Sequence, residues 1–325
     1  MRLIVADIGG TNARFAVSAQ GEPSLCHITH LRCADFVGFE DAFERFLTGI
    51  PRDQQGGHHA LSLAVAGPVN EQIVDVSNNH WRFDKTRLLE RLALDKLLVI
   101  NDFTAQALAQ HNAADGDRRQ ILDGIEDSSA PLLVIGPGTG LGVSALIPVV
   151  HGPLPVEGEG GNIRFAPQTE PERDLCAYME QQTDHVVVEH FVSGPGLENI
   201  HRFLANSAGI EPSLSAEMIA TSALREEGIC RDAVNLMIGI LGTVMRDHVL
   251  TMGCWRGAVI TGGIMPRLQS LINSSPLKQR FRSAGEMSYI LGNVPVWLSK
   301  DPHAGLKGAL AAFGNPYLAH RMVTG

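Results

Sequence analysis

The sequence has few of the features that mark secreted, membrane or nucleic-acid-binding proteins. It contains only five cysteines, an odd number with no C-x-x-C pair, so a disulfide framework is not expected. It has no long basic run and its formal net charge is −9, which disfavours binding to a nucleic-acid backbone. No apolar stretch approaches the length of a membrane span, and the run before Asp7 is too short for a signal-peptide core. We therefore expect a cytoplasmic protein that binds neither nucleic acid nor membrane.

The apolar content and its pattern are those of an α/β protein. Hydrophobic residues make up 44% of the 325 residues, which is enough for a substantial core, and the length suggests two domains. Strand-like and helix-like runs alternate along the chain, as in α/β folds. Apolar spacing predicts helices over 35–50, 84–92 and 231–252, with Asp84 as an N-cap, and a buried strand over 96–102.

A carboxylate and a Gly-Gly-Thr-Asn turn separate two strand-like runs in "LIVADIGGTNARFAV", residues 3 to 17. A plain hairpin would explain the two glycines but would need neither Asp7 nor the polar residues that follow them. Glycine lets backbone N–H groups approach an anion, and hydroxyl and amide side chains add hydrogen bonds. This turn is therefore predicted to hold phosphoryl oxygens. Its predicted phosphate ligands are Gly9, Gly10, Thr11 and Asn12.

The same pattern occurs a second time in "LLVIGPGTGLGVSAL", residues 132 to 146. Aligning Leu3 with Leu132 places Gly9 over Gly138, so the chain is predicted to be internally duplicated. Two related α/β halves would then face one cleft, which is where ligands bind. A pair of glycine turns on such a cleft would hold the phosphates of ATP.

A third glycine turn supports this prediction. "GAVITGGIMPRL", residues 257 to 268, predicts a strand, a Gly-Gly turn and a helix starting near Pro266. By itself it also fits an ordinary strand-to-helix connection. The predicted ATP-binding residues of the second and third turns are Gly138, Thr139, Gly140, Gly262 and Gly263.

Six motifs, in this order along the chain, resemble bacterial glucokinases of the non-ROK group, within the actin/hexokinase ATPase superfamily. They are "DIGGTN" at 7–12, "NDF" at 101–103, "GPGTGLG" at 136–142, "EGEGGN" at 157–162, "SGPGL" at 193–197 and "TGGI" at 261–264. The resemblance covers essentially the whole chain. It implies a duplicated ribonuclease H-like (actin/hexokinase-type) α/β fold with an interdomain cleft. A small domain would comprise 1–110 plus the C-terminal helix around 303–325, and a large domain 111–302.

The resemblance implies a glycolytic transferase that moves a phosphoryl group from ATP to the 6-hydroxyl of D-glucose. Asp102 would be the general base, and Asp7 would hold Mg²⁺ through water. Considered alone, Glu159 is also explained as a loop carboxylate and Glu189 as an exposed helix residue. The positions that match the family's glucose contacts are Asn101, Asp102, Glu159, Asn162 and Glu189, with Asn78 as a weaker candidate.

One position departs from the family pattern. The segment reads Glu-Gly-Gly-His in that pattern, whereas Asn162 ends it here, so weaker glucose binding is expected. Two alternatives stay open: a non-catalytic sugar sensor of the same fold, and a kinase for another hexose. The combination of Asp7 with Asp102 favours an enzyme, because a sensor has no need of a base. The sequence also leaves open inorganic polyphosphate as a donor and a homodimer as the assembly.

Overall fold

The structure is a computed structural model that describes residues 2–19, 24–51, 58–111, 113–114, 116–211 and 214–325. The chain forms two compact units. The first unit comprises Met1–Ala114, Leu146–Glu157 and Asp301–Gly325. The second comprises Asp115–Ala145 and Gly158–Lys300. The sequence had assigned 146–157 to the other domain, and the domain boundaries 1–110 plus 303–325 and 111–302 stay a prediction.

The first unit is built on a six-stranded sheet with the order β14-β7-β4-β1-β2-β3. The three strands β7, β4 and β1 run parallel to one another. The other three are each antiparallel to their neighbours. The strands are β1 (Arg2–Ile8), β2 (Asn12–Ala19), β3 (Cys26–Arg32), β4 (His58–Val65), β7 (Lys96–Asn101) and β14 (Val323–Thr324). Because parallel strands present their carboxyl ends at one edge, the ends of β1 and β7 lie on the same side of this sheet.

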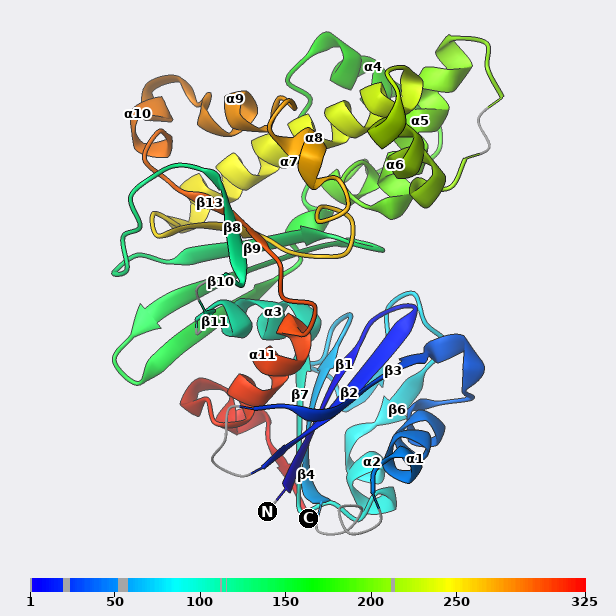
Figure 1. The fold of residues 1–325 in the computed structure, drawn as a ribbon, viewed down its shortest axis with the longest axis vertical. Coiled ribbons are helices and arrows are strands. Elements are labelled where there is room, and N and C mark those ends of the chain that lie inside the picture. The colour runs from blue at the N-terminus through cyan, green and yellow to red at the C-terminus, as the bar shows by residue number, and fades with distance from the viewer. Residues whose placement is uncertain (1, 20–23, 52–57, 112, 115, 212–213) are drawn as a thin grey trace. The chain divides into compact units, whose positions relative to one another are not determined.

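Helices lie against both faces of this sheet (Figure 1). The helices are α1 (Phe39–Gly49), α2 (Lys85–Arg91), α3 (Asp102–His111) and α11 (Ala304–Phe313). Phe46 of α1 stacks on Phe15 of β2 with ring centroids 5.2 Å apart, inside the apolar core. Asp84 caps α2 by accepting a 3.0 Å hydrogen bond from the Arg87 amide, which confirms the predicted N-cap. The unit also contains a small ladder of β5 (Ile73–Asp75) and β6 (Arg82–Asp84), and the 3-10 helices η1 (Cys33–Asp35) and η6 (Pro316–Arg321).

A second six-stranded sheet has the order β11-β10-β9-β12-β13-β8. Strands β9, β12 and β13 are parallel, and β8 pairs antiparallel with β13. The strands are β8 (Arg118–Leu122), β9 (Leu132–Pro137), β10 (Leu141–Val149), β11 (Gly152–Gly158), β12 (Gly257–Ile260) and β13 (Val296–Ser299). The pair β9-β10 repeats the strand, glycine turn and strand of β1-β2, as the duplication predicted.

Helices α5, α6 and α9 of the second unit pack against α7, the long yellow helix in Figure 1. The helices of this unit are α4 (Glu170–Glu180), α5 (Gly194–Ser207), α6 (Ala216–Arg225), α7 (Ile229–Met252), α8 (Gln269–Ile272), α9 (Leu277–Arg282), α10 (Ser288–Leu291) and the 3-10 helices η3 (Gly160–Asn162), η4 (Val188–His190) and η5 (Gly285–Met287). Helix α7 confirms the helix predicted over 231–252. It is long and apolar enough to cross a membrane, but 72% of its most apolar window is buried inside the protein, as in a core helix.

Two predicted helices differ from the structure. The segment after Gly263 forms successive i→i+3 turns, with Arg267 N bonded to Ile264 O, and the helix α8 begins only at Gln269 rather than near Pro266. The C-terminal helix expected around 303–325 ends already at Phe313. Asn315 is extended, as residues before proline generally are, so the chain leaves the helix there and continues as η6 and β14.

Candidate active site

Asp7 lies near the carboxyl end of β1, where it is buried and paired with a cation. Its side chain faces Arg14, the residue directly opposite on β2, and Arg14 Nη1 donates a 3.0 Å hydrogen bond to Asp7 Oδ2. Burial raises the pKa of Asp7 above its usual value, and the Arg14 guanidinium opposes that rise. The sheet therefore holds a carboxylate at a place where ionisation is costly, which is typical of functional sites.

The turn after Asp7 has a fixed backbone and free side chains. Gly9 N donates to Asn12 O at 2.9 Å, and the Gly9 carbonyl accepts a 3.2 Å hydrogen bond from Asn79 Nδ2. A Cβ on Gly10 would lie 3.1 Å from Asn78 Cβ, so the turn packs closely on the segment around that residue. Thr11 and Asn12 are exposed and available to a ligand. Asn78, the weaker sugar candidate, is itself exposed with a left-handed φ of 55°.

Asn101 and Asp102 stand where β7 gives way to α3. Asp102 is half-buried and is the first residue of the helix rather than the last of the strand. The Asp102 Oδ1 atom accepts a 2.9 Å hydrogen bond from the Phe103 amide. Asn101 Oδ1 also accepts from Phe103 N, at 2.8 Å, and Asn101 Nδ2 donates to Gly67 O at 3.2 Å. Both ends of the Asn101 amide are thus bonded within the protein, and its glucose contact stays a prediction.

Helix α11 packs closely against the two segments that carry Asp7 and Asp102. A Cβ on Gly305 would lie 2.4 Å from Asp7 Oδ2, and one on Gly308 would lie 1.8 Å from the carbonyl oxygen of Ala105 in α3. Only glycine fits at these two contacts, because any larger residue would force the elements apart. The helix thereby fixes β1 and α3 together, and Asp7 and Asp102 with them. The sequence analysis missed this role, although a Gly-x-x-Gly spacing on an apolar helix was its signal.

The second glycine turn lies beside the start of a long helix. Gly138 N donates to Gly140 O at 2.8 Å, and the Gly138 carbonyl accepts a 2.8 Å hydrogen bond from Gly194 N, the first residue of α5. Ser193 caps α5 by accepting from Gly196 N at 2.9 Å. The positive end of a 14-residue helix is therefore joined to the turn, which favours an anion there. Sequence analysis gave the motif "SGPGL" no role, although serine followed by proline is typical of a helix start.

The third turn adjoins the second because β9 and β12 are neighbouring parallel strands. A Cβ on Gly262 would lie 2.5 Å from Pro137 O, and the φ of Gly262 is 87°, so glycine is required for both reasons. Gly263 has open space around it. The structure thus brings the predicted residues of these two turns together at the carboxyl ends of two strands, where α/β proteins bind ligands.

Glu189 has a structural contact that sequence analysis did not predict. It lies in η4, half-buried, and its Oε2 accepts a 2.6 Å hydrogen bond from Leu141 N, just after the second turn. A Cβ on Gly140 would lie 2.5 Å from the same oxygen. The alternative of an exposed helix residue is therefore wrong for Glu189, because the carboxylate closes the backbone of the glycine turn. Its glucose contact stays a prediction.

Glu159 directly precedes the short helix η3, and Asn162 is the last residue of that helix. Asn162 N donates to Glu159 O at 2.9 Å, and Asn162 Nδ2 lies 3.4 Å from Glu159 Oε2, so the two side chains are neighbours. Both are exposed. A 3.1 Å hydrogen bond from Val188 N to Ile163 O joins the ends of η3 and η4, which brings Glu159, Asn162 and Glu189 into one region. We call residues 159–162 the sugar turn, after its predicted role.

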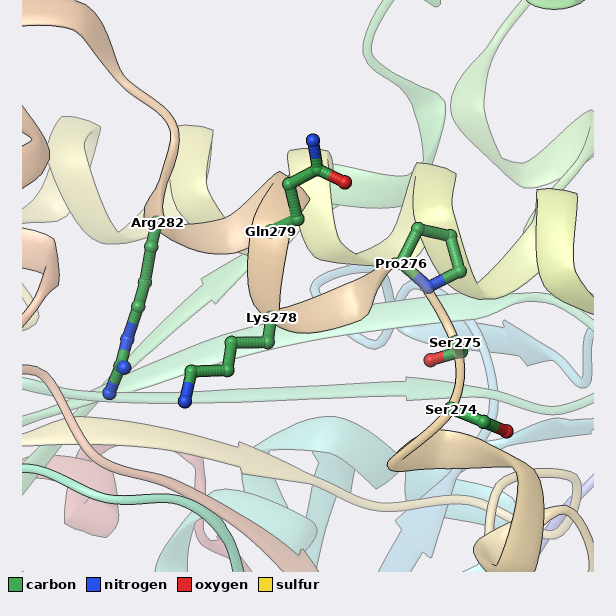
Figure 2. Close-up of a pocket in the computed structure, with 6 residues that line it drawn as sticks. All are labelled: Ser274, Ser275, Pro276, Lys278, Gln279 and Arg282. Carbon is green, nitrogen blue, oxygen red and sulfur yellow. The ribbon is translucent and has the colours of Figure 1, made fainter.

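The second unit also contains a hollow of about 640 Å³, which is lined by other residues than the glycine turns and the sugar turn. Figure 2 shows its lining, which comes from the connection before α9 and from α9 itself: Ser274, Ser275, Pro276, Lys278, Gln279 and Arg282. None of the predicted site residues lines it. Within the described residues, no group of three or more histidine, cysteine, aspartate or glutamate side chains is arranged to hold a metal ion. A metal at Asp7 would therefore depend on water and substrate for its other ligands.

The fold and the three glycine turns define a sugar kinase of the actin/hexokinase class. The family model for glucokinase matches residues 4–315. A glucokinase of Hahella chejuensis is 35% identical over 96% of this chain and 97% of its own, and one of Helicobacter pylori (strain P12) is 38% identical over 98% and 96%. The crystal structure of a glucokinase from an Antarctic psychrotroph matches with a TM-score of 0.82 and 31% identity, over 97% of this chain and 99% of its own. The chain belongs to the glucokinase family, and the enzyme phosphorylates glucose.

Proposed function

We propose that the protein transfers the γ-phosphoryl group of ATP to the 6-hydroxyl of D-glucose, with Asp102 as the general base. The observation that carries this proposal is the placement of Asp102. Its carboxylate is half-buried at the carboxyl end of β7, the edge at which Asp7 also lies, and one oxygen is held by the Phe103 amide. A carboxylate held at this edge can accept a proton from a hydroxyl group, which is the requirement for a base.

The reaction needs one proton transfer and one phosphoryl transfer. Asp102 takes the proton of the 6-hydroxyl as that oxygen forms a bond to the γ-phosphorus. The bond from the γ-phosphorus to the bridging oxygen breaks, and ADP leaves with the electron pair. Phosphoryl transfer has a loose transition state, so most of the catalysis comes from positioning and from neutralising charge on the phosphate oxygens.

The glycine turns of both units are the proposed phosphate sites: Gly9 and Gly138 close the two turns with their own N–H groups, and the other residues of the turns would supply the donors. Gly9, Gly10, Thr11 and Asn12 would hold phosphoryl oxygens from the first unit. The turn 138–140 and Gly262-Gly263 would hold them from the second, assisted by the positive end of α5 at Gly194. The open space around Gly263 and the exposed side chain of Thr139 support this assignment.

Mg²⁺ is proposed as the metal and Asp7 as its anchor. Magnesium takes few protein carboxylates and keeps several waters, which fits a site with a single acidic side chain. The raised pKa of Asp7 also fits, because a divalent cation beside it would stabilise the charged form that burial disfavours. When bound, the metal would neutralise charge on the phosphates. Arg14 orients the Asp7 carboxylate in its absence.

Glucose is proposed to bind to Asn101, Asp102, Glu159, Asn162 and Glu189. Sugar hydroxyls both donate and accept, so they need the mixture of carboxylates and amides that these residues supply. The exposure of Glu159 and Asn162 supports their availability. We further propose a cytoplasmic location, where ATP is available, and leave the choice between monomer and homodimer to light scattering.

The test is a coupled assay of ADP release with glucose, mannose, fructose and N-acetylmannosamine, each with and without EDTA. Turnover should be fastest with glucose and should require the divalent metal. A preference for another hexose would replace the sugar assignment. Binding of glucose without turnover on any sugar would favour the sensor alternative. Turnover with polyphosphate in place of ATP would change the donor and leave the role of Asp102 intact.

A further inference from the structure

A buried histidine that the proposed mechanism does not use lies against the sugar turn. His248 is on α7 and only 9% of it is exposed. A Cβ on Gly160 would lie 2.9 Å from His248 Cε1 and 2.8 Å from Val143 Cβ. The imidazole is therefore in contact with the backbone of the segment that carries Glu159 and Asn162.

The contact is polar as well as steric. A hydrogen bond joins the imidazole to the Gly160 backbone. Burial lowers the pKa of His248, and this hydrogen bond and the nearby Asp247 offset only part of that lowering. His248 Nε2 is buried and has no hydrogen-bond partner among the described atoms. A leucine at this position would fill similar space without burying an unsatisfied nitrogen, so packing alone does not explain a histidine.

The sugar turn needs outside support because its centre is two glycines. Gly160 and Gly161 have no side chains to fix them, and glycine has the most backbone freedom of any residue. A Cβ on Gly161 would lie 2.3 Å from Leu141 O, so the turn depends on this close approach to β10 on one side. On the side of Gly160 it depends on Val143 and the His248 ring.

We propose that His248 is a positioning residue for glucose: it fixes the Gly160 backbone so that Glu159 and Asn162 are held in the geometry that binds the sugar. This inference rests on the proposed glucose contacts of the sugar turn. It also gives a reason why Asn162 is tolerated where the family pattern has histidine. An imidazole reaches the same turn from α7, against the backbone, and limits its freedom before the sugar arrives.

The experiment compares His248→Leu with a matched control. His201→Leu is the control, because His201 is also on a helix, is 5% exposed and has a pKa lowered by burial. For His248→Leu we expect the glucose Kd, measured by calorimetry without ATP, and the KM for glucose to rise by about tenfold, the effect of one lost hydrogen bond and some ordering. The kcat and the KM for ATP should stay within about twofold, because His248 touches no reacting atom.

A second variant, His248→Gln, keeps a hydrogen-bond donor and should recover part of the glucose affinity. It also keeps the proposal testable should the leucine variant fail to fold. Equal glucose Kd values for wild type and both His248 variants would overturn the proposal, as would an equal rise in His201→Leu. The outcome is independent of the proposed reaction, because an enzyme that binds glucose without turnover would refute the role of Asp102 and still report on His248.

Discussion

The first and second glycine turns have the same strand, turn and strand framework but obtain their charged groups differently. At the first turn the carboxylate is local: Asp7 is on the strand itself and pairs with Arg14 on the next strand. At the second turn, no acidic residue lies on β9 or β10. The carboxylate there belongs to Glu189, which accepts a hydrogen bond from the amide of Leu141, 48 residues earlier in the chain. The Asp7 carboxylate accepts a hydrogen bond from a side chain, whereas the Glu189 carboxylate accepts one from a backbone amide.

This difference indicates that the carboxylates beside the two turns have different roles. A carboxylate that accepts a backbone N–H has a structural task, whereas a buried one with a raised pKa is poised for a ligand or a metal. The second unit adds the positive end of α5 and the sugar turn, which we propose hold the phosphates and the glucose. We therefore expect substitutions at the carboxylates of the first unit to lower kcat, and substitutions in the second unit to act mainly on KM.

The largest effect is expected for Asp102→Asn. The amide keeps the shape and the hydrogen bond from Phe103 but cannot take the proton, so kcat should fall about 10³-fold while glucose still binds. Steady-state kinetics and calorimetry measure the two parts. Asp95→Asn, an exposed aspartate just before the other end of β7, is the control and should keep full activity. More than about a tenth of wild-type turnover in Asp102→Asn would remove it from the role of base.

Asp7→Asn should have the next largest effect. Loss of the charge that anchors the metal should lower kcat on the order of 100-fold and raise the Mg²⁺ concentration needed for half-maximal activity. Glu40→Gln is a control that removes a half-buried carboxylate of α1, which is paired with Arg91 of α2 and is not part of the turn. An unchanged dependence on Mg²⁺ would show that the metal is anchored elsewhere.

Asp7→Asn should lower kcat but should not lower the stability of the protein at neutral pH. The reason is the way in which the contribution of Asp7 to stability depends on pH. The pKa of Asp7 is raised in the folded state, so the native protein binds this proton more tightly than the unfolded chain does. Its contribution to stability is present below the usual pKa of 3.8 and is lost as the pH rises through the folded value. At neutral pH the free energy of unfolding of Asp7→Asn should therefore be no lower than that of wild type. Chemical denaturation at pH 7 measures this, and a clear loss of stability would show that the Arg14 pair outweighs the cost of burial.

A pair of glycine variants sharpens the comparison inside the second turn. A Cβ on Gly140 would lie 2.5 Å from Glu189 Oε2, whereas the nearest atom to a Cβ on Gly138 is 4.0 Å away. Gly140→Ala should displace the carboxylate from Leu141 N, lower stability by about 1–3 kcal/mol and raise KM for both substrates. Gly138→Ala should change stability by less than about 0.5 kcal/mol. Similar unfolding free energies for both variants would show that the Glu189 contact is unimportant.

Local patterns in the sequence were sufficient for the elements and for the three turns. The Asp84 cap, the long helix over 231–252 and the alternation of strands with glycine turns are each encoded within a few consecutive residues. The helix expected near Pro266 was wrong because i→i+3 turns replace its first turn. The glucose contacts and the roles of Asp7 and Asp102 were named through the family resemblance, and the local pattern could not have separated Glu189 from an ordinary surface acid.

What could not be predicted depends on contacts between distant segments. Glu189 meets Leu141, Gly305 meets Asp7 and His248 meets Gly160 only after the chain has folded. None of these pairs leaves a periodic signal, because each joins elements whose separation in sequence is arbitrary. The glycines at these contacts were visible in the sequence, but a glycine does not reveal which neighbour requires it.

The smallest effect is expected at the position where this chain departs from its family, Asn162. Its amide is exposed and lies 3.4 Å from Glu159 Oε2, a long hydrogen bond that holds neither side chain firmly. The imidazole of Asn162→His reaches further and should contact a sugar hydroxyl directly, which would lower the KM for glucose roughly fivefold, or about 1 kcal/mol, with little change in kcat.

Combining Asn162→His with His248→Leu makes a double-mutant cycle. Because both side chains act on the same short turn, their effects on glucose Kd should not be additive, and the gain from Asn162→His should shrink when His248 is absent. Strict additivity would mean that the two residues act independently, and lost activity in Asn162→His alone would mean that the pocket is built around asparagine.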